Sequence, residues 1–435
     1  MVEGWSRFAL RFGDYYKSLN HNDLWVPPRL KSREWMFIPW GSSPPDRHRG
    51  FLDKKGLSDY LSQKSPHSCF HSTAYYKYPN ERKMIDKDWL GADLIFDLDG
   101  DHLPGVSDND FPTMISKIQE QAWTLWSDFL HPEFGFEEKY VQTSFSGHRG
   151  FHIHVRDPSL LHLDSNARRQ LVNYIRGEGI NVQTILSGPD SGWQNRINNG
   201  IKSVTHKLKV IKEKGPDHKS YIDELQTAVE NSGKASKFSS KKLSKPKINE
   251  IADLADEERL SRLLSDNKLR VFGEKNTSIF WDMVKGDNSV VLGSAGETDE
   301  AVTVDVKRVI RWIGSLHGKC GLKVTEMPLE RLNPFSQNHF NPLEESIVFS
   351  SDKKFNVLLN RDDVTAELAG VRVEGNSGDR FEVTESLATF ITTQAKRVHI
   401  AVKPSEDCST KEEENENMER EPFWVWMVKH ACKRS

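Results

Sequence analysis

The first two hundred residues alternate short apolar runs with longer amphipathic segments, as strands and helices do in a mixed fold. The run at 92–96, apolar apart from Asp93, is typical of a buried strand. Segments 111–129 and 165–176 instead repeat apolar residues at helical spacing. This alternation predicts an α/β fold.

The pattern changes in the middle of the chain. Segments with helical spacing at 221–229 and 251–264 flank a Lys/Ser-rich stretch at 233–242, which is too polar to join a core and predicts a flexible loop. We therefore expect a small helical insertion at 206–272. Apolar positions at helical spacing return at 303–313 and predict a further helix there.

Composition narrows the class of protein. Of the 435 residues 28% are charged, but the net charge is only −3, so any nucleic-acid surface must be a local basic patch. Four scattered cysteines favour a reducing compartment over a disulfide scaffold. No apolar run approaches the ~18 residues of a membrane span, and the N-terminus lacks signal-peptide features. We expect a cytoplasmic protein without a membrane partner.

Candidate chemistry begins where the predicted strand ends, at Asp97 and Asp99. Because side chains alternate along a strand, both carboxylates lie on one face, with their backbones roughly 7 Å apart. Two carboxylates at that separation can hold a pair of metal ions about 4 Å apart. Further on, Arg149 and His152 stand among small residues at 146–150, where phosphate oxygens can approach the backbone. Carboxylates for metal and a phosphate site together indicate chemistry on a nucleotide.

With these motifs laid out, the chain resembles the small catalytic subunit of archaeal and eukaryotic DNA primases, most of all the archaeal branch. The resemblance rests, in the family's order, on segments 33–35, 47–51, 89–103, 146–155 and 299–319. Segment 89–103 resembles the family's strand with two catalytic aspartates, and 146–155 resembles its Ser-Gly-x-Arg-Gly-x-His motif. Segment 299–319 resembles the region of its third aspartate and its basic Ser-Leu-His-Gly-Lys element.

The resemblance implies template-directed nucleotidyl transfer by two metal ions. Asp97, Asp99 and Asp299 would be the catalytic residues and would hold Mg²⁺ or Mn²⁺. The residues implied to bind the nucleotide are Ser146, His148, Arg149, His152, Arg311, His317 and Lys319, with Glu34 and Arg47 as additional candidates. The implied product is a short RNA primer, with DNA as a further option, made from nucleoside triphosphates on a single-stranded DNA template during replication. The implied partner is a large iron–sulfur subunit in a heterodimer.

The implied architecture is the archaeo-eukaryotic primase catalytic domain with a small helical insertion. The catalytic domain would occupy 1–205 and 273–402, on either side of the insertion at 206–272. The remainder, 403–435, would form an acidic linker and a C-terminal segment. The basic Lys/Ser loop of the insertion is a candidate contact for single-stranded DNA.

A structural zinc is common in this family between the aspartate strand and the Arg-Gly-x-His motif. Residues 103–145 contain no cysteine and only one histidine, His131, so we expect no structural zinc there. His67, Cys69 and His71 offer an alternative site, because alternate residues of a strand share a face and three ligands are enough for zinc. Packing of these residues in a core explains the same pattern.

Three other functions compete with the primase interpretation. Segment 95–100 also looks like the opening motif of haloacid-dehalogenase-type phosphatases, but that family wants Thr or Val after the glycine, where this chain has Asp101. A non-catalytic nucleic-acid-binding subunit would not retain three aspartates. A repair-type primase-polymerase of the same superfamily is the third alternative, and the lack of fused ligase, nuclease or helicase motifs favours the replicative subunit over it.

Overall fold

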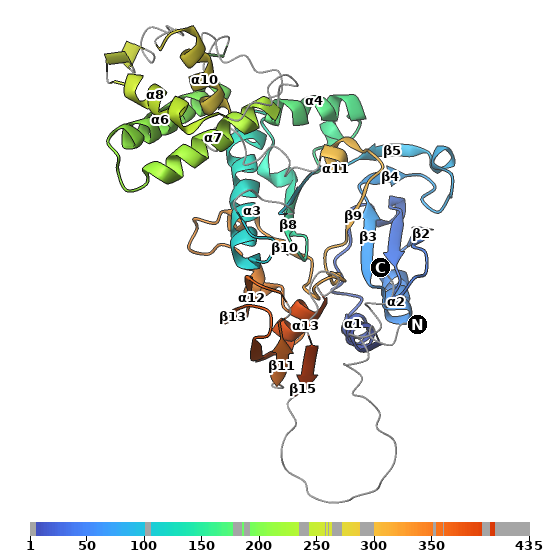
Figure 1. Cartoon of the computed structure of the whole chain (residues 1–435). Coiled ribbons are helices and arrows are strands. Elements are labelled where there is room, and N and C mark those ends of the chain that lie inside the picture. Colours follow the sequence, from blue (N-terminus) through green and yellow to red (C-terminus); the bar gives the residue numbers. More distant parts are fainter. Residues whose placement is uncertain are drawn as a thin grey trace, which may run out of the picture. The chain divides into compact units, whose positions relative to one another are not determined.

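The structure is a computed structural model that describes residues 6–100, 106–176, 185–186, 192–234, 243–256, 258–259, 261–262, 272–287, 300–350, 354–359, 361–393 and 401–404. Asp299, most of the Lys/Ser loop and nearly all of 403–435 lie outside the described residues. The chain divides into two compact units (Figure 1). Unit 1 consists of Met1–Ala122, Glu138–Ser165 and Ala301–Ser435, and unit 2 consists of Trp123–Glu137 and Asn166–Glu300.

Unit 1 is built on two four-stranded antiparallel sheets, with helices packed beside them. The first sheet has the strand order β2-β1-β3-β9, and the second has the order β10-β7-β8-β6. Their strands are β1 (Trp35–Ile38), β2 (Asp46–Arg49), β3 (Ser68–Ser72), β6 (Leu94–Asp99), β7 (Val141–Phe145), β8 (Gly150–Val155), β9 (Val309–Arg311) and β10 (Thr325–Met327). The strand predicted from the run at 92–96 is therefore confirmed as β6, shifted by a few residues.

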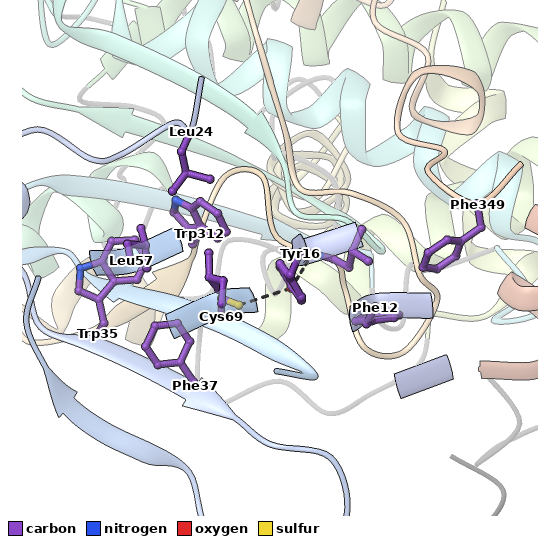
Figure 2. Close-up of a cluster of buried hydrophobic side chains, with 11 residues drawn as sticks. Phe12, Tyr16, Leu24, Trp35, Phe37, Leu57, Cys69, Trp312 and Phe349 are labelled. Carbon is purple, nitrogen blue, oxygen red and sulfur yellow. Dashed lines mark hydrogen bonds between the residues drawn. The ribbon is translucent and has the colours of Figure 1, made fainter. Parts of the chain in front are cut away.

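Aromatic side chains dominate the core that holds the first sheet. The cluster comprises Phe12, Tyr16, Leu24, Trp35, Phe37, Leu57, Leu61, Cys69, Trp312, Leu316 and Phe349 (Figure 2). The helices α1 (Ser6–Ser18) and α2 (Lys54–Lys64) supply part of it. Trp35 and Trp312 pack edge to face with their ring centroids 5.9 Å apart. Burial of each large apolar side chain stabilises the fold by on the order of 1.5–3 kcal/mol, so this cluster ties distant segments to one sheet.

The predicted helices at 111–129 and 165–176 are confirmed. The first is α3 (Phe111–Leu125), which continues into a π-helical turn at Trp126–Leu130, and the second is α4 (Ser165–Ile175). In α3 the buried apolar residues lie at helical spacing: Phe111, Met114, Ile115, Ile118, Ala122 and Leu125. The chain passes from unit 1 to unit 2 within α3.

The predicted helix at 303–313 is wrong for most of its length. Helix α11 covers Glu300–Val304, and the chain then forms strand β9, which pairs with β3. Ile310 packs with Ile95 and Val302 in a small buried cluster. Because Val309 and Ile310 are β-branched and β3 offers an open edge, sheet pairing outweighs the helical spacing of the apolar residues.

The last third of unit 1 adds two small β elements. Three strands pair in the order β14-β11-β15, and two form the hairpin β12-β13. The remaining strands and helices of this unit are β4 (Ala74–Tyr76), β5 (Trp89–Ala92), β11 (Lys354–Leu358), β12 (Val364–Leu368), β13 (Val371–Gly375), β14 (Arg380–Thr384), β15 (Ala401–Pro404), α12 (Pro342–Glu345) and α13 (Glu385–Thr393). Short 3-10 helices occur at Leu30–Ser32, Met84–Lys87, Glu138–Tyr140, Pro158–Leu160 and Leu329–Leu332.

Unit 2 is helical in the part that the structure describes. Besides α4 its helices are α6 (Gly192–Lys212), α7 (His218–Lys234), α8 (Lys245–Leu254) and α10 (Glu274–Lys285). The helix predicted at 221–229 lies within α7. The one predicted at 251–264 is confirmed in part: α8 begins at Lys245 and ends at Leu254, and described residues are helical again at 258–259 and 261–262. Pro246, at the start of α8, suits the first turn of a helix, where no backbone N–H is needed.

Unit 2 spans more of the chain than the insertion expected at 206–272. It includes α6 from Gly192 and the segment Trp123–Glu137. A compact unit of the structure and a domain of the family are different divisions, so the domain boundaries stay a prediction. None of the described helices is long and apolar enough to cross a lipid bilayer.

Candidate active site

The two aspartates of β6 stand at the end of the second sheet. Asp97 lies opposite His152 of β8, and its Oδ1 is 3.3 Å from His152 Nε2. The Asp97 side chain is 21% exposed, while Asp99 lies opposite Gly150 and is exposed to solvent. Both side chains point from the same face of the strand. On that face Asp99 is accessible from solvent, and Asp97 is held further in.

The Ser-Gly-x-Arg segment forms the turn between β7 and β8. Gly147 has a φ of +84°, a conformation that favours glycine, and its carbonyl accepts a hydrogen bond from the Cys320 thiol at 2.8 Å. The Ser146 hydroxyl accepts a hydrogen bond from the Gly150 backbone N–H at 3.1 Å. A Cβ on Gly150 would lie 2.3 Å from the carbonyl oxygen of Leu98. Only glycine therefore lets β8 approach the aspartate strand this closely.

Two of the predicted phosphate ligands are held in this turn. Arg149 is buried, and its Nη2 donates to the backbone carbonyl of Asp108 at 3.3 Å. The His148 ring stacks on the His317 ring, with centroids 4.8 Å apart and planes 17° from parallel. The turn is thereby placed next to the segment that follows β9.

The segment after β9 is held by the aromatic core. Trp312 is fully buried and donates its indole N–H to the Trp25 carbonyl at 3.1 Å. The Tyr16 hydroxyl accepts a hydrogen bond from the Leu316 backbone N–H at 3.3 Å. These contacts fix the residues on either side, Arg311 and His317, which are the ones predicted to bind phosphate.

Arg311 and His317 are positioned for an anion. Burial lowers the pKa of Arg311, while Cys320 and Asp97 act in the opposite direction, so Asp97 lies within electrostatic reach of the guanidinium. The Nη1 atom of Arg311 is buried and has no hydrogen-bond partner among the described residues. Burial and the charge of Arg311 hold the pKa of His317 well below its usual range, so His317 is neutral at physiological pH. A buried guanidinium nitrogen without a hydrogen-bonding partner suits phosphate oxygens.

The structure brings together most of the predicted site. Described contacts join Asp97 to His152, His148 to His317, and the turn at 146–149 to the segment at 311–320. The Lys319 side chain is exposed, and only its backbone N–H contacts this group, through His317 Nδ1 at 3.2 Å. Asp299 lies outside the described residues, so its role stays a prediction.

Glu34 and Arg47 lie in a second polar cluster. The buried Glu34 carboxylate is 3.6 Å from Arg47 Nη2, 3.1 Å from His48 Nδ1 and 3.4 Å from Lys87 Nζ. The sequence analysis missed His48 and Lys87. His48 could have been found from its position next to Arg47. Lys87 could not, because it is distant in sequence.

A buried charge network beneath the site was also missed. Arg33 Nη2 donates to Asp93 at 2.8 Å, Arg156 Nε donates to it at 3.1 Å, and the Tyr75 hydroxyl donates to it at 2.5 Å. Asp93 and Arg33 are fully buried. Asp93 precedes β6 and Arg156 follows β8, so this network fixes the ends of the two strands that carry Asp97 and His152.

The donor set at β6 fits a hard divalent cation in part. Asp97 and Asp99 supply carboxylate oxygens, which Mg²⁺ and Mn²⁺ prefer. Among the described residues no group of three or more His, Cys, Asp and Glu side chains is close enough to hold a metal ion. A third carboxylate would have to come from outside them, as Asp299 would.

The alternative zinc ligands are occupied by other contacts. Cys69 lies in the aromatic core, 3.5 Å from the Tyr16 hydroxyl (Figure 2). The Nδ1 atom of His71 lies 3.1 Å from the Ser72 carbonyl, and the His67 ring lies so close to Gly318 that an added Cβ would be 2.0 Å from it. These placements agree with packing in a core. The expected lack of a structural zinc stays a prediction.

Comparison with known proteins decides the family. The family model described as DNA primase small subunit matches residues 96–328, which include both aspartates, the turn at 146–149 and the segment at 311–319. The chain belongs to the DNA primase small subunit family. The predicted resemblance and the α/β primase fold are thereby confirmed, and a primase small subunit is a nucleotidyltransferase, so the phosphatase alternative is not supported.

Relatives in this family match the chain along most of its length. The DNA primase small subunit PriS of Methanothrix thermoacetophila is 34% identical over 88% of this chain and 95% of its own length. That of Methanococcoides burtonii is 34% identical over 78% of this chain and 85% of its own. That of Halobacterium salinarum is 30% identical over 78% and 83%.

Proposed function

We propose that this chain is the catalytic subunit of a DNA primase and synthesises short RNA primers, with DNA as a further option, on single-stranded DNA. The observation that carries the proposal is the placement of Asp97 and Asp99 on one strand face, beside His152 and within reach of Arg311. Carboxylates for a cation and basic groups for phosphates are the two requirements of nucleotidyl transfer.

Asp97, Asp99 and Asp299 are the proposed ligands of Mg²⁺ or Mn²⁺. When bound, the metal supplies positive charge that stabilises the attacking and leaving oxygens of the phosphoryl transfer. The His152 contact to Asp97 orients that carboxylate before metal binds. Asp99, exposed at the end of β6, keeps a carboxylate on the side from which substrate can enter.

Arg149, Arg311 and His317 are the proposed ligands of the triphosphate. A guanidinium binds phosphate by two parallel hydrogen bonds and keeps its charge at every working pH. Because His317 is neutral, it can donate one hydrogen bond without adding charge beside Arg311. Ser146, His148, His152 and Lys319 complete the proposed nucleotide site.

A larger partner subunit is part of the proposal. The relatives are named small subunits, which supports a heterodimer for this chain, and the family resemblance implies an iron–sulfur protein as the large subunit. A repair-type primase-polymerase would act without it. Co-purification of the tagged chain with a large iron–sulfur subunit would separate the two functions.

The proposal is tested by primer synthesis from labelled nucleotides on single-stranded DNA with Mg²⁺ or Mn²⁺, with and without the large subunit. Arg149→Ala should weaken nucleotide use by about 2–5 kcal/mol, the scale of a truncated buried charge pair, and Arg149→Lys should rescue it poorly. Arg380→Ala, which removes an exposed arginine of β14, is the matched control. No synthesis by the wild-type complex, or wild-type kinetics for Arg149→Lys, would contradict the proposal.

A further inference from the structure

Helix α6 of unit 2 exposes a face without a single acidic side chain. It is the longest described helix, with 21 residues, and contains no Asp or Glu. The exposed residues of α6 are Asn195, Asn199, Lys202, His206, Lys209 and Lys212. Lys212 donates to the backbone carbonyl of Asp253 at 3.1 Å. The other five lie at helical spacing on one face. Glu213, also exposed, comes just after α6 and marks the end of this face. We call these five residues the α6 face.

The basic residues of α6 are sorted by side. Arg196 turns inward, where its Nη2 is 2.8 Å from Asp128 and its guanidinium lies 3.6 Å from the Phe129 ring centroid. Lys207 is 2.8 Å from Asp287 and 3.1 Å from Glu224. No ion pair within the described part of the chain includes Lys202 or Lys209. The inward cations are therefore neutralised by the fold, and the outward ones are not.

A neighbouring helix shows what an ordinary solvated face looks like. α7 exposes Lys219, Asp223 and Glu230, so it carries both signs of charge. Mixed charges keep a helix soluble without favouring one ligand. The single sign on the α6 face needs another explanation, in a chain whose net charge is −3.

We propose that the α6 face binds the phosphate backbone of the single-stranded DNA template. From Asn195 to Lys209 the face runs about 21 Å, at 1.5 Å per residue, which matches about six phosphates of a stacked strand at 3.4 Å each. The asparagine amides, like the lysines, donate hydrogen bonds to phosphate oxygens. This inference rests on the proposed function, which supplies the template.

An aromatic pair beside the lysines favours nucleic acid over an acidic protein segment. His206 meets the Tyr221 ring edge to face, with centroids 6.1 Å apart and planes 67° apart. Tyr221 is partly exposed. Single-strand binding surfaces combine cations for the backbone with rings on which bases stack, and the α6 face offers both.

The test compares two variants with the same change in charge. Lys202→Gln/Lys209→Gln removes the outward lysines, and Lys245→Gln/Lys247→Gln removes two lysines of α8 that are paired with Asp223 and Glu250 at 2.7 and 2.8 Å. Binding of a labelled oligothymidylate is measured by fluorescence anisotropy at several salt concentrations. The slope of log affinity against log salt should fall by about 1.4 for the α6 double variant, or about 0.7 per lysine, and should not change for the α8 variant.

The single variants Lys202→Gln and Lys209→Gln should each give half of this change, and thermal melting should show both folded. An unchanged slope in the double variant overturns the inference. If the double variant also no longer binds the large subunit, the face belongs to a protein partner instead. Primer synthesis is scored separately: a wild-type chain that makes primers while the slope is unchanged refutes only the α6 face, whereas a wild-type chain that makes none refutes the proposed function.

Discussion

Adjacent residues have opposite tasks at this site. Leu98 and Trp312 are buried, while their neighbours Asp97 and Arg311 face the site. Because side chains alternate along a strand, core packing of one residue sets the direction of the next. The geometry of the charged groups is thus fixed by apolar side chains that never contact substrate.

Asp97→Asn should abolish primer synthesis without unfolding the protein. Asn lacks the negative charge that a metal ion needs, but it keeps the size of the side chain and can still contact His152. We expect a loss of at least about a hundredfold in synthesis, the scale of one lost electrostatic stabiliser. The free energy of unfolding should change by less than about 1 kcal/mol, because the side chain is not fully buried.

The control is Asp59→Asn, which removes an exposed carboxylate paired with Lys55 at 2.7 Å. It should leave both synthesis and stability unchanged. Wild-type synthesis by Asp97→Asn would remove the central assignment of the site. If Asp97→Asn and Asp59→Asn unfold at the same urea concentration, a loss of synthesis in Asp97→Asn is not caused by a loss of fold.

In contrast to Asp97→Asn, Asp93→Asn should lower the free energy of unfolding. Arg33 would remain fully buried without a compensating charge, which costs about 3–5 kcal/mol. Burial raises the pKa of Asp93, but the charges of Arg33 and Arg156 outweigh it and bring the pKa below its usual value. The folded pKa is depressed, so this stabilisation is present above the unfolded pKa and is lost as pH falls through the folded value.

Urea unfolding at pH 7 measures the effect of Asp93→Asn, with Asp88→Asn as the matched control. Asp88 is exposed and forms a surface ion pair with Lys77 at 3.8 Å. Surface pairs contribute little, so its substitution should lower the free energy of unfolding by less than about 0.5 kcal/mol. If Asp93→Asn is as stable as Asp88→Asn, the buried network does not hold the two strands.

At the scale of elements, the close approach of β8 to β6 depends on one glycine. Gly150→Ala would place a methyl group 2.3 Å from the Leu98 carbonyl oxygen, a backbone atom that cannot rotate away. The two strands must then separate, which should cost about 1–3 kcal/mol and displace Asp97 from His152. Primer synthesis should fall with stability.

Gly56→Ala is the control for that prediction. Gly56 lies inside α2, and its nearest neighbour to an added Cβ is 3.5 Å away, so alanine should stabilise by up to about 1 kcal/mol and leave synthesis unchanged. Thermal melting and primer assays on both variants measure the difference. Wild-type activity in Gly150→Ala would show that the strand spacing is not critical.

The sequence predicted single elements better than their assembly. α3 and β6 follow from local apolar spacing, which their own residues carry. β9 could not be found this way, because its conformation depends on the open edge of β3, more than two hundred residues away. The Arg33–Asp93–Arg156 network was missed for the same reason: each residue is an ordinary polar residue until the fold buries it.

At the scale of the whole molecule, charge is distributed unevenly. Composition predicted that a nucleic-acid surface must be a local patch, and the α6 face of unit 2 is the patch that we propose, while Asp97, Asp99, Arg149 and Arg311 belong to unit 1. Unit 1 also contains buried ionisable side chains. They make its free energy of unfolding depend on pH.

His71 gives that dependence a measurable form. Burial, with the charge of Arg33, lowers the pKa of His71 from 6.5 to about 3. The unfolded chain therefore binds a proton below pH 6.5 that the folded chain does not, and the free energy of unfolding falls by about 1.4 kcal/mol per pH unit between these values. The stabilisation is fully present above pH 6.5 and is lost as pH falls.

We expect His71→Asn to reduce this acid sensitivity while lowering stability at pH 7, where packing against Trp25 and Trp35 is lost. Urea unfolding is followed between pH 7 and pH 5 by tryptophan fluorescence, to which the indole rings of Trp25 and Trp35, 6.0 and 5.8 Å from the His71 ring, contribute. The difference in unfolding free energy between wild type and variant should shrink by about 1.4 kcal/mol for each pH unit below 6.5.

His21→Asn, at an exposed position, should leave the wild-type slope intact. A His71→Asn protein with the wild-type slope would mean that His71 is protonated in the folded state, and that the first sheet tolerates a charge in its core.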